Sequence, residues 1–237
     1  MRIIRFIVKS LQSFSRTDWI VWIGSMTVLT ITFIISGMGS PLALIVTLVG
    51  AADLIFIAKG NVLGQFLAVA FALLYGLISF QYHYYGETIT YLCMSAPTNA
   101  VAAIAWIRNP YNETEVEVAP MSRQKWLIVI PATIITTVVM YFVLGAWNTP
   151  QLELSTISVT TSFLAAALMF FRNRFYAVAY MSNDIILIGL WLFATFNDIS
   201  YLPMVINFII FFLNDLYGFI SWKKMSIRQE QPREQEA

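Results

Sequence analysis

Seven asparagine and aspartate side chains lie inside long apolar runs of this sequence. They are amides and carboxyls, and such a group inside an apolar helix is costly unless it is paired or faces water. They therefore indicate either a site for a polar solute or hydrogen bonds between helices, which are worth about 0.6 kcal/mol each on average. As a set, they favour a lined cavity. The seven are Asp53, Asn99, Asn183, Asp184, Asn207, Asn214 and Asp215.

The spacing of these residues places aromatic rings beside several of them. Residues seven apart share one face of an α-helix. An amide or carboxyl beside an aromatic plane suits a flat heterocycle joined to a sugar, because the ring can stack and the hydroxyls can hydrogen-bond. A cationic ring would gain further from an aromatic face or an aspartate. The pairs are Asn99 with Trp106, Asp184 with Trp191, Asn207 with Asn214, and Asp215 with Trp222.

Other roles are open to some of these residues. Asp53 lies near cations, and we expect it to pair with Lys59 or Arg172. Trp106 and Trp222 fall at the borders of their apolar runs, where tryptophan is enriched as an interfacial anchor. We expect that anchoring role for both, and the position of Trp191 also allows it.

Gln65, the prolines and the single cysteine complete the candidates. Gln65 lies near one mouth of the predicted bundle and is a candidate gate. Pro97 and Pro203 could kink their helices and free carbonyl groups near a cavity, or act only as passive bends. Cys93 has no intrachain partner for a disulfide, and we expect it to be a small buried hydrophobic residue.

The composition places these groups in a membrane. Of the 237 residues, 59% are apolar and 11% are charged, whereas soluble domains have about 45–50% and about 25%. The mean hydropathy is +0.72, and a single membrane domain accounts for most of the sequence. No basic run with interleaved aromatic residues is present, so nothing indicates nucleic acid as a partner; membrane lipid is the expected surrounding.

We predict an all-α membrane protein with about eight transmembrane helices, since roughly 20 apolar residues cross the hydrocarbon. Turn sequences such as Lys59-Gly60-Asn61 and Arg172-Asn173-Arg174 separate the runs. Residues 1–18 and 223–237 are predicted to be a cytoplasmic N-terminus and a cytoplasmic tail, and the tail is expected to be disordered after Ser226. Residues 108–125 are predicted to form a solvated tether. The single transport domain spans 19–222, with spans at 19–36, 41–58, 62–82, 87–107, 126–147, 155–171, 175–196 and 199–222.

The cations set the orientation. Lysine and arginine near span ends resist translocation far more than acids do. With the N-terminus inside, all 14 Lys and Arg residues fall on the cytoplasmic side, while the opposite side carries Glu87, Glu153 and Asp198. Both ends are therefore predicted to be cytoplasmic, with an even number of spans. A cleaved signal peptide within 1–36 is disfavoured, because the run 19–35 is long and lacks a small-x-small exit.

The two halves of the chain follow one plan. Residues 41–107 and 155–222 each contain an apolar run, a basic turn and two further runs. The halves close on Asn99-x6-Trp106 and Asp215-x6-Trp222, and span 126–147 links them. Because the linker is a single span, the two three-helix repeats would be parallel rather than inverted.

This plan resembles the nicotinamide riboside transporter (PnuC) family of bacterial vitamin transporters over most of residues 41–222. The resemblance implies a fold similar to full-length SWEET sugar transporters, a homotrimer in the bacterial cytoplasmic membrane, and facilitated diffusion of a nucleoside-like vitamin precursor trapped inside by phosphorylation. It implies no bound cofactor. The motifs are Lys59-Gly60-Asn61, Tyr85-Gly86-Glu87, Pro97, Trp106, Arg174-Phe175-Tyr176 and Gly218-x3-Trp222.

One feature widens the choice of substrate. Some members of the family carry a Trp-x-x-Trp motif in the second repeat, whereas the only such pair here is Trp19 and Trp22 in the first span. Thiamine, riboflavin and deoxynucleosides, which relatives of this family carry, are therefore candidate substrates in addition to nicotinamide riboside. The predicted substrate-binding residues are Asn99, Asn183, Asp184, Trp191, Asn207, Asn214 and Asp215, with Gln65 as the gate. Proton coupling through Asp184 or Asp215 stays open.

Membrane enzymes and receptors are the rival classes. Zinc hydrolysis needs several His or Cys ligands, and the chain has one of each. Asp184 and Asp215 could form an aspartyl dyad, but no flanking protease signature accompanies them. A retinal Schiff base needs a mid-helix lysine, and a P-loop needs Gly-x4-Gly-Lys-Ser/Thr; the sequence has neither. A purely structural or receptor role would not require aligned polar groups in both halves.

Overall fold

The computed structural model describes residues 2–37, 41–81, 88–149 and 151–235, and the regular secondary structure within them is helical apart from one isolated β-bridge. The predicted motif Tyr85-Gly86-Glu87 and residues 38–40 lie outside this described part. The elements are α1 (Arg2–Gln12), α2 (Arg16–Ser36), α3 (Pro41–Ala58), α4 (Val62–Gln81), the π-helical η1 (Thr90–Ser95), α6 (Ala96–Arg108), α7 (Arg123–Ala146), α8 (Leu152–Phe170), α9 (Tyr176–Asn197), the 3₁₀ turn η2 (Ile199–Tyr201) and α10 (Leu202–Gln235).

Among the described residues, seven helices are long and apolar enough to cross a membrane: α2, α3, α4, α7, α8, α9 and α10. The predicted span at 87–107 has a different form, because the π-helical η1 precedes α6, which has 13 residues. Pro97 stands where η1 passes directly into α6: Ser95 and Ala96 are helical, and the N–H of Ala96 donates to the carbonyl of Tyr91, five residues back. Pro97 therefore lies inside a continuous helical stretch, at the place where its hydrogen-bond pattern changes. Pro203 stands in the first turn of α10, where its missing N–H costs nothing.

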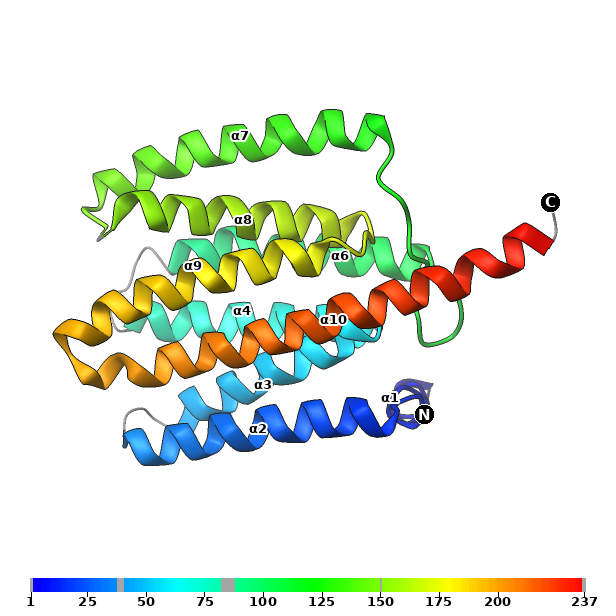
Figure 1. Cartoon of the computed structure of the whole chain (residues 1–237), viewed down its shortest axis with the longest axis horizontal. Helices are drawn as coiled ribbons and strands as arrows, with labels where there is room; N and C mark the ends of the chain where they lie inside the picture. The colour runs from blue at the N-terminus through cyan, green and yellow to red at the C-terminus, as the bar shows by residue number, and fades with distance from the viewer. Residues whose placement is uncertain (1, 38–40, 82–87, 150, 236–237) are drawn as a thin grey trace.

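Six helices form a closed ring. Around it, α3 packs against α4, α4 against α6, α6 against α8, α8 against α9, α9 against α10, and α10 against α3. Two further helices lie outside the ring: α2 contacts α3 and α10, and α7 contacts α8. Figure 1 shows the long helices running side by side, with α7 and α2 at opposite edges of the bundle and both chain termini toward the same end. The ring therefore has one half from each part of the chain.

The cations gather at that same end, here termed the basic end. Lys59 follows α3, Arg108 closes α6, Arg123 begins α7 and Arg172 follows α8. In Figure 1 these helix ends all lie on the side of the two termini. The charge asymmetry expected from the sequence is therefore present in the packed bundle.

The two basic turns have matching backbones. Gly60 has φ +62° and Arg172 has φ +58°, so each turn uses a left-handed residue at the same place. A glycine adopts that conformation easily, while Arg172 bears a cost of about 1–2 kcal/mol. In each turn an asparagine caps the next helix: Asn61 accepts from the N–H of Leu63 at 2.9 Å, and Asn173 accepts from that of Phe175 at 3.1 Å.

The segment 109–121, here termed the strap, bridges the two turns. The N–H of Val116 donates to the carbonyl of Gly60 at 2.9 Å, and that of Ala119 donates to the carbonyl of Arg172 at 3.0 Å. The predicted tether is solvated only in part: Tyr111, Asn112 and Glu113 are exposed and Val116 is buried. The strap is also more than a tether, because it satisfies backbone groups that the turns leave open. Glu113 of the strap also pairs with Lys9 of α1.

The C-terminal segment is also ordered by the strap. α10 continues as a helix to Gln235, so the prediction of a disordered tail was wrong. Gln229 accepts from the N–H of Val118 at 2.8 Å and donates to the carbonyl of Val116 at 3.1 Å. Arg228 pairs with Glu115.

The first spanning helix is fixed to the ring by a buried ion pair. Asp18 is fully buried, and its carboxylate lies 3.2 Å from the ammonium group of Lys59. The hydroxyl of Tyr217 on α10 donates to the same carboxylate. The N–H of Ser15 donates to it as well at 2.6 Å, within a capping box that begins α2. Removing one partner of such a buried ion pair strongly destabilises the protein, because the other charge is left buried without compensation.

Candidate functional site

Two buried tryptophans join the halves of the ring near the basic end. Trp106 of α6 is 2% exposed and Trp222 of α10 is 0% exposed. The indole N–H of Trp106 donates to the carbonyl of Met169 at 3.0 Å, and that of Trp222 donates to the carbonyl of Ile57 at 2.8 Å. Their ring centroids are 5.5 Å apart. The prediction that both are interfacial anchors was wrong, because both indoles are buried in the protein.

Deeper in the ring, three aspartates and two tyrosines from α3, α9 and α10 form a buried polar group, here termed the aspartate cluster. Asp215 interacts electrostatically with Asp184 and with Asp53, and the carboxyls of Asp184 and Asp215 are adjacent. Tyr180 interacts with all three carboxyls, and Tyr176 with Asp215. All three aspartates are less than 9% exposed. The cluster thus brings three carboxyl groups together inside the ring.

The expected partners of Asp53 are engaged elsewhere. Lys59 pairs with Asp18, and Arg172 donates from its Nε to the carbonyl of Glu117 at 3.0 Å. The prediction that Asp53 pairs with one of them was therefore wrong. Asp53 instead belongs to the aspartate cluster, and among the described residues the lysines and arginines lie at or beyond the ends of the apolar stretches of the helices.

Asn183 adjoins the cluster on α9 and is held by α8. Its Oδ1 accepts from the hydroxyl of Ser158 at 2.8 Å and from that of Thr161 at 3.1 Å. Because these bonds occupy the carbonyl oxygen, the amide group would offer donors rather than an acceptor to a solute.

Asn214 and Asn207 follow one face of α10. The amide nitrogen of Asn214 donates to the hydroxyl of Ser25 on α2 and to the carbonyl of Ile210, both at 2.8 Å. Asn214 therefore ties α2 to the ring. Within the part of the chain that the structure describes, the Oδ1 atoms of Asn207 and Asn214 have no hydrogen-bond partner.

Gln65 of α4 is the most deeply buried of the predicted residues. It is 0% exposed, and neither its Oε1 nor its Nε2 has a hydrogen-bond partner among the described residues. The same holds for Oδ2 of Asp184. Buried polar atoms without protein partners are the groups that a polar solute can hydrogen-bond. Gln65 thus has polar atoms available to a bound solute, and its role as a gate stays a prediction.

Trp191 and Asn99 occupy different places. The ring of Trp191 packs against Tyr201 of η2, with centroids 5.6 Å apart, at the end of the bundle away from the basic end. Trp191 is therefore not part of the aspartate cluster. Asn99 is 9% exposed on α6, and its position relative to Trp106 matches that of Asp215 relative to Trp222.

Sequence reasoning missed Tyr176 and Tyr180. They precede Asp184 at intervals of four residues, a spacing that places all three on one helix face. The prediction relied on residues seven apart and so passed over this pattern. The roles of Ser158 and Thr161 toward Asn183 depend on helix packing and leave no signal of their own in the sequence.

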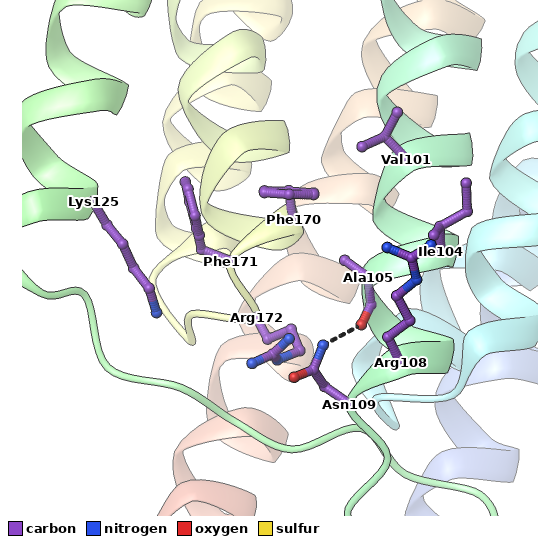
Figure 2. Close-up of a pocket in the computed structure, with 9 residues that line it drawn as sticks. All are labelled: Val101, Ile104, Ala105, Arg108, Asn109, Lys125, Phe170, Phe171 and Arg172. Carbon is purple, nitrogen blue, oxygen red and sulfur yellow. Dashed lines mark hydrogen bonds between the residues drawn. The ribbon is translucent and has the colours of Figure 1, made fainter.

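Two cavities lie elsewhere. One, of about 450 Å³, is lined by residues of α6 and α7 and by the end of α8 (Figure 2), and none of the predicted binding residues lines it. The other, of about 270 Å³, lies among η1, α7 and α8, and Cys93 lines it. Cys93 is exposed, so the prediction that it is buried was wrong.

A ring of apolar helices around buried carboxyls and amides is the architecture of a polytopic α-helical membrane transporter, with polar groups lining a path for a solute. Over residues 40–224 the sequence matches the family model described as nicotinamide mononucleotide transporter. The chain belongs to this transporter family, and it is not an enzyme. The match begins just before α3, so α1 and α2 precede the matched region.

Relatives and a solved structure agree with this assignment. The chain is 27% identical to the nicotinamide riboside transporter PnuC of Neisseria mucosa, over 78% of this chain and 73% of that protein. It is 22% identical to that of Haemophilus influenzae, over 87% and 89%. The crystal structure of a vitamin B3 transporter PnuC is 23% identical, with a TM-score of 0.79, and covers 95% of this chain and 98% of that one. That structure shares the fold.

Proposed function

We propose that this protein takes up nicotinamide riboside by facilitated diffusion, and that phosphorylation inside the cell traps the product. The observation that carries the proposal is the aspartate cluster, which gathers Asp53, Asp184 and Asp215 inside the ring. Nicotinamide riboside has one positive charge on its pyridinium ring, and a buried carboxylate favours a cation nearby. The names of the two bacterial relatives support the same substrate.

Charge distinguishes the riboside from the mononucleotide. A phosphate monoester adds a charge of about −1.5 to −2 at pH 7. Two like charges 4 Å apart repel by about 4 kcal/mol at an effective dielectric constant of 20. Because the described spans place no lysine or arginine near the cluster, the mononucleotide would meet repulsion with no compensating cation. The riboside is therefore the favoured form.

Among the related substrates, thiamine is the nearest alternative, because it too carries a cationic ring. Riboflavin and deoxynucleosides are neutral and would gain less from the carboxyls. Trp19 and Trp22 do not supply a stacking platform at the cluster. Their rings pack around Phe14 at the start of α2, with centroid distances of 5.6 Å and 5.8 Å.

In this proposal the pyridinium ring lies against the aspartate cluster, and Gln65, Asn99 and Asn183 hydrogen-bond the amide and ribose. The layer of Trp106 and Trp222 separates this site from the basic end, since both indoles are buried there. Movement of one half of the ring against the other would expose the site to each side in turn, without coupling to a proton.

The proposed architecture has eight spans, with η1 and α6 together forming the fourth. Two parallel three-helix repeats, 41–107 and 155–222, would be joined by α7, as in full-length SWEET transporters, with α2 as the extra helix. The closed ring and the matching turns at Gly60 and Arg172 support this arrangement. We place both termini in the cytoplasm of a bacterial cell, with the protein as a homotrimer in the inner membrane. The gathering of the cations at one end supports that orientation.

A thermal-shift screen of the purified protein tests the substrate. Nicotinamide riboside, nicotinamide mononucleotide, thiamine, riboflavin and deoxynucleosides would be compared, with Gln65→Ala and Asn183→Ala as site variants. We expect the riboside to raise the unfolding midpoint of the wild type and to lose that effect in both variants through binding linkage. Stabilisation by another compound, or none at all, would contradict the proposal.

A further inference from the structure

A cationic cavity lies outside the ring, on the side where α7 is attached. Its volume is about 450 Å³, and it lies between α6 and α7 at the end of α8. Three of its lining residues are cations and none is acidic. The cations are Arg108, which closes α6, Lys125 in the first turn of α7, and Arg172, which follows α8. These three residues come from three different helices or helix ends, and all of them lie at the basic end of the bundle.

The charges of this cavity are poorly compensated. In the part of the chain that the structure describes, Arg108 and Lys125 form no ion pair with an acidic side chain. The ammonium group of Lys125 donates to the carbonyl of Pro120 at 3.2 Å and lies 5.5 Å from the centroid of the Phe171 ring. Among the described residues, Glu117 is the carboxylate that attracts Arg172. The cavity therefore has a net positive potential.

The rest of the lining is apolar and follows the helices toward the membrane interior. Val101 is 50% exposed and Ile104 is 51% exposed on α6, and Phe170 and Phe171 form the facing wall from α8. In Figure 2 Val101, Phe170 and Phe171 lie farther from the strap than Arg172 does. The cavity is thus amphipathic, with cations at the level of a span end and an apolar wall leading inward.

We propose that this cavity binds one anionic phospholipid. Its phosphate would lie between Arg108, Lys125 and Arg172, and an acyl chain would lie along Val101, Ile104 and Phe170. Basic pockets between helices at the cytoplasmic membrane surface recognise acidic headgroups, and each cation contributes about 1 kcal/mol to that attraction. Seated there, the lipid would fill the gap between the linker helix α7 and the first half of the ring.

Lipid binding to the purified wild type tests the proposal. Native mass spectrometry would count retained phosphatidylglycerol and phosphatidylcholine of identical chain length, and the unfolding midpoint would be measured with each. The double variant Arg108→Gln with Lys125→Gln removes two cations from the cavity. We expect it to bind phosphatidylglycerol about 30-fold more weakly, the equivalent of about 1 kcal/mol for each charge, while phosphatidylcholine binding stays unchanged.

A charge-matched control is available on α10. Lys223→Gln with Lys224→Gln removes two exposed cations from the same end of the bundle but outside the cavity. We expect this control to keep wild-type binding of phosphatidylglycerol. Equal loss in the two double variants would overturn the proposal, because it would show a general attraction to the basic end rather than a site.

Two further measurements separate the lipid from other occupants. Inorganic phosphate should stabilise the wild type far less than phosphatidylglycerol does, and Ile104→Trp, which fills the apolar wall, should weaken lipid binding without changing charge. Equal protection by phosphate would overturn the lipid assignment. A change of oligomeric state in Ile104→Trp with unaltered lipid retention would also overturn it, because a second copy of the chain would then cover the cavity. Binding of nicotinamide riboside should be intact in all these variants.

Discussion

Trp106 and Trp222 make the same hydrogen bond from opposite halves of the ring. Each indole N–H donates to a carbonyl at the end of the other half's first helix, Trp106 to Met169 and Trp222 to Ile57. The two rings also contact each other. The halves are therefore held together at the basic end by an exchanged pair of bonds, directly between the strap and the aspartate cluster.

Replacing either indole by phenylalanine should destabilise the protein. Trp222→Phe removes one of the two donors to the carbonyl of Ile57, which also accepts from the N–H of Gly60 at 2.8 Å, and the loss of one such hydrogen bond costs about 0.5–1.5 kcal/mol. Trp106→Phe should cost a similar amount, and the double variant should deviate from additivity because the rings touch. Denaturant or thermal unfolding measures the change. Trp147→Phe, at an exposed position, is the control, and equal loss there would refute the argument.

Gln65→Leu should raise stability while abolishing substrate binding. The native side chain buries an amide with no protein partner among the described residues, and removing such a group relieves about 1–3 kcal/mol. Gln229→Leu is the matched control, because that amide makes two hydrogen bonds to the strap and its loss should destabilise. Thermal unfolding with and without nicotinamide riboside checks both effects. A drop in stability for Gln65→Leu would contradict this account.

Neutralising the aspartate cluster should weaken binding of a cationic substrate selectively. We expect Asp215→Asn and Asp184→Asn each to reduce the affinity for nicotinamide riboside by at least about tenfold, equivalent to about 1.4 kcal/mol. Glu153→Gln is the control, at the start of α8 and at the end of the bundle away from the basic end. It should leave the affinity for nicotinamide riboside unchanged. Calorimetric titration supplies the affinities. Wild-type affinity in both aspartate variants would remove the electrostatic basis of the proposal.

A pH gradient should not drive accumulation. Facilitated diffusion brings the substrate to equal concentrations on both sides, whereas proton coupling through Asp184 or Asp215 would concentrate it. Reconstituted vesicles with an imposed pH gradient and labelled nicotinamide riboside measure this directly. Uptake that rises above equilibration, and that collapses when a proton ionophore is added, would establish coupling instead.

The spans could be predicted from the sequence because their cause is local. Apolar runs of sufficient length form helices in lipid, and the turns at Lys59 and Arg172 end them with recognisable chemistry. The gathering of the cations at one end of the bundle could be predicted for the same reason. The depth of Trp106 and Trp222 was not, since a tryptophan close to a cationic turn has the same local pattern whether it faces lipid or a neighbouring helix.

The errors at the site have a tertiary origin. Asp53 was expected to pair with Lys59 or Arg172, but Asp18 from the preceding helix pairs with Lys59, and Arg172 donates to the carbonyl of Glu117 in the strap. The strap looked like a polar linker because its partners, Gly60 and Arg172, are backbone groups that no sequence pattern displays. The buried amides and carboxyls were found because their polarity contrasts with their surroundings, but which of them meet depended on helix packing.

The most direct test of the central claim is counterflow in vesicles that contain the purified protein. Vesicles loaded with unlabelled nicotinamide riboside would be diluted into labelled nicotinamide riboside, with nicotinamide mononucleotide or thiamine as competitors. We predict transient accumulation of the label. Excess unlabelled riboside outside the vesicles should abolish this accumulation, mononucleotide should not reduce it, and vesicles with the Asp215→Asn variant should not show it. No counterflow of the riboside, or competition by the mononucleotide as strong as by the riboside itself, would contradict the account.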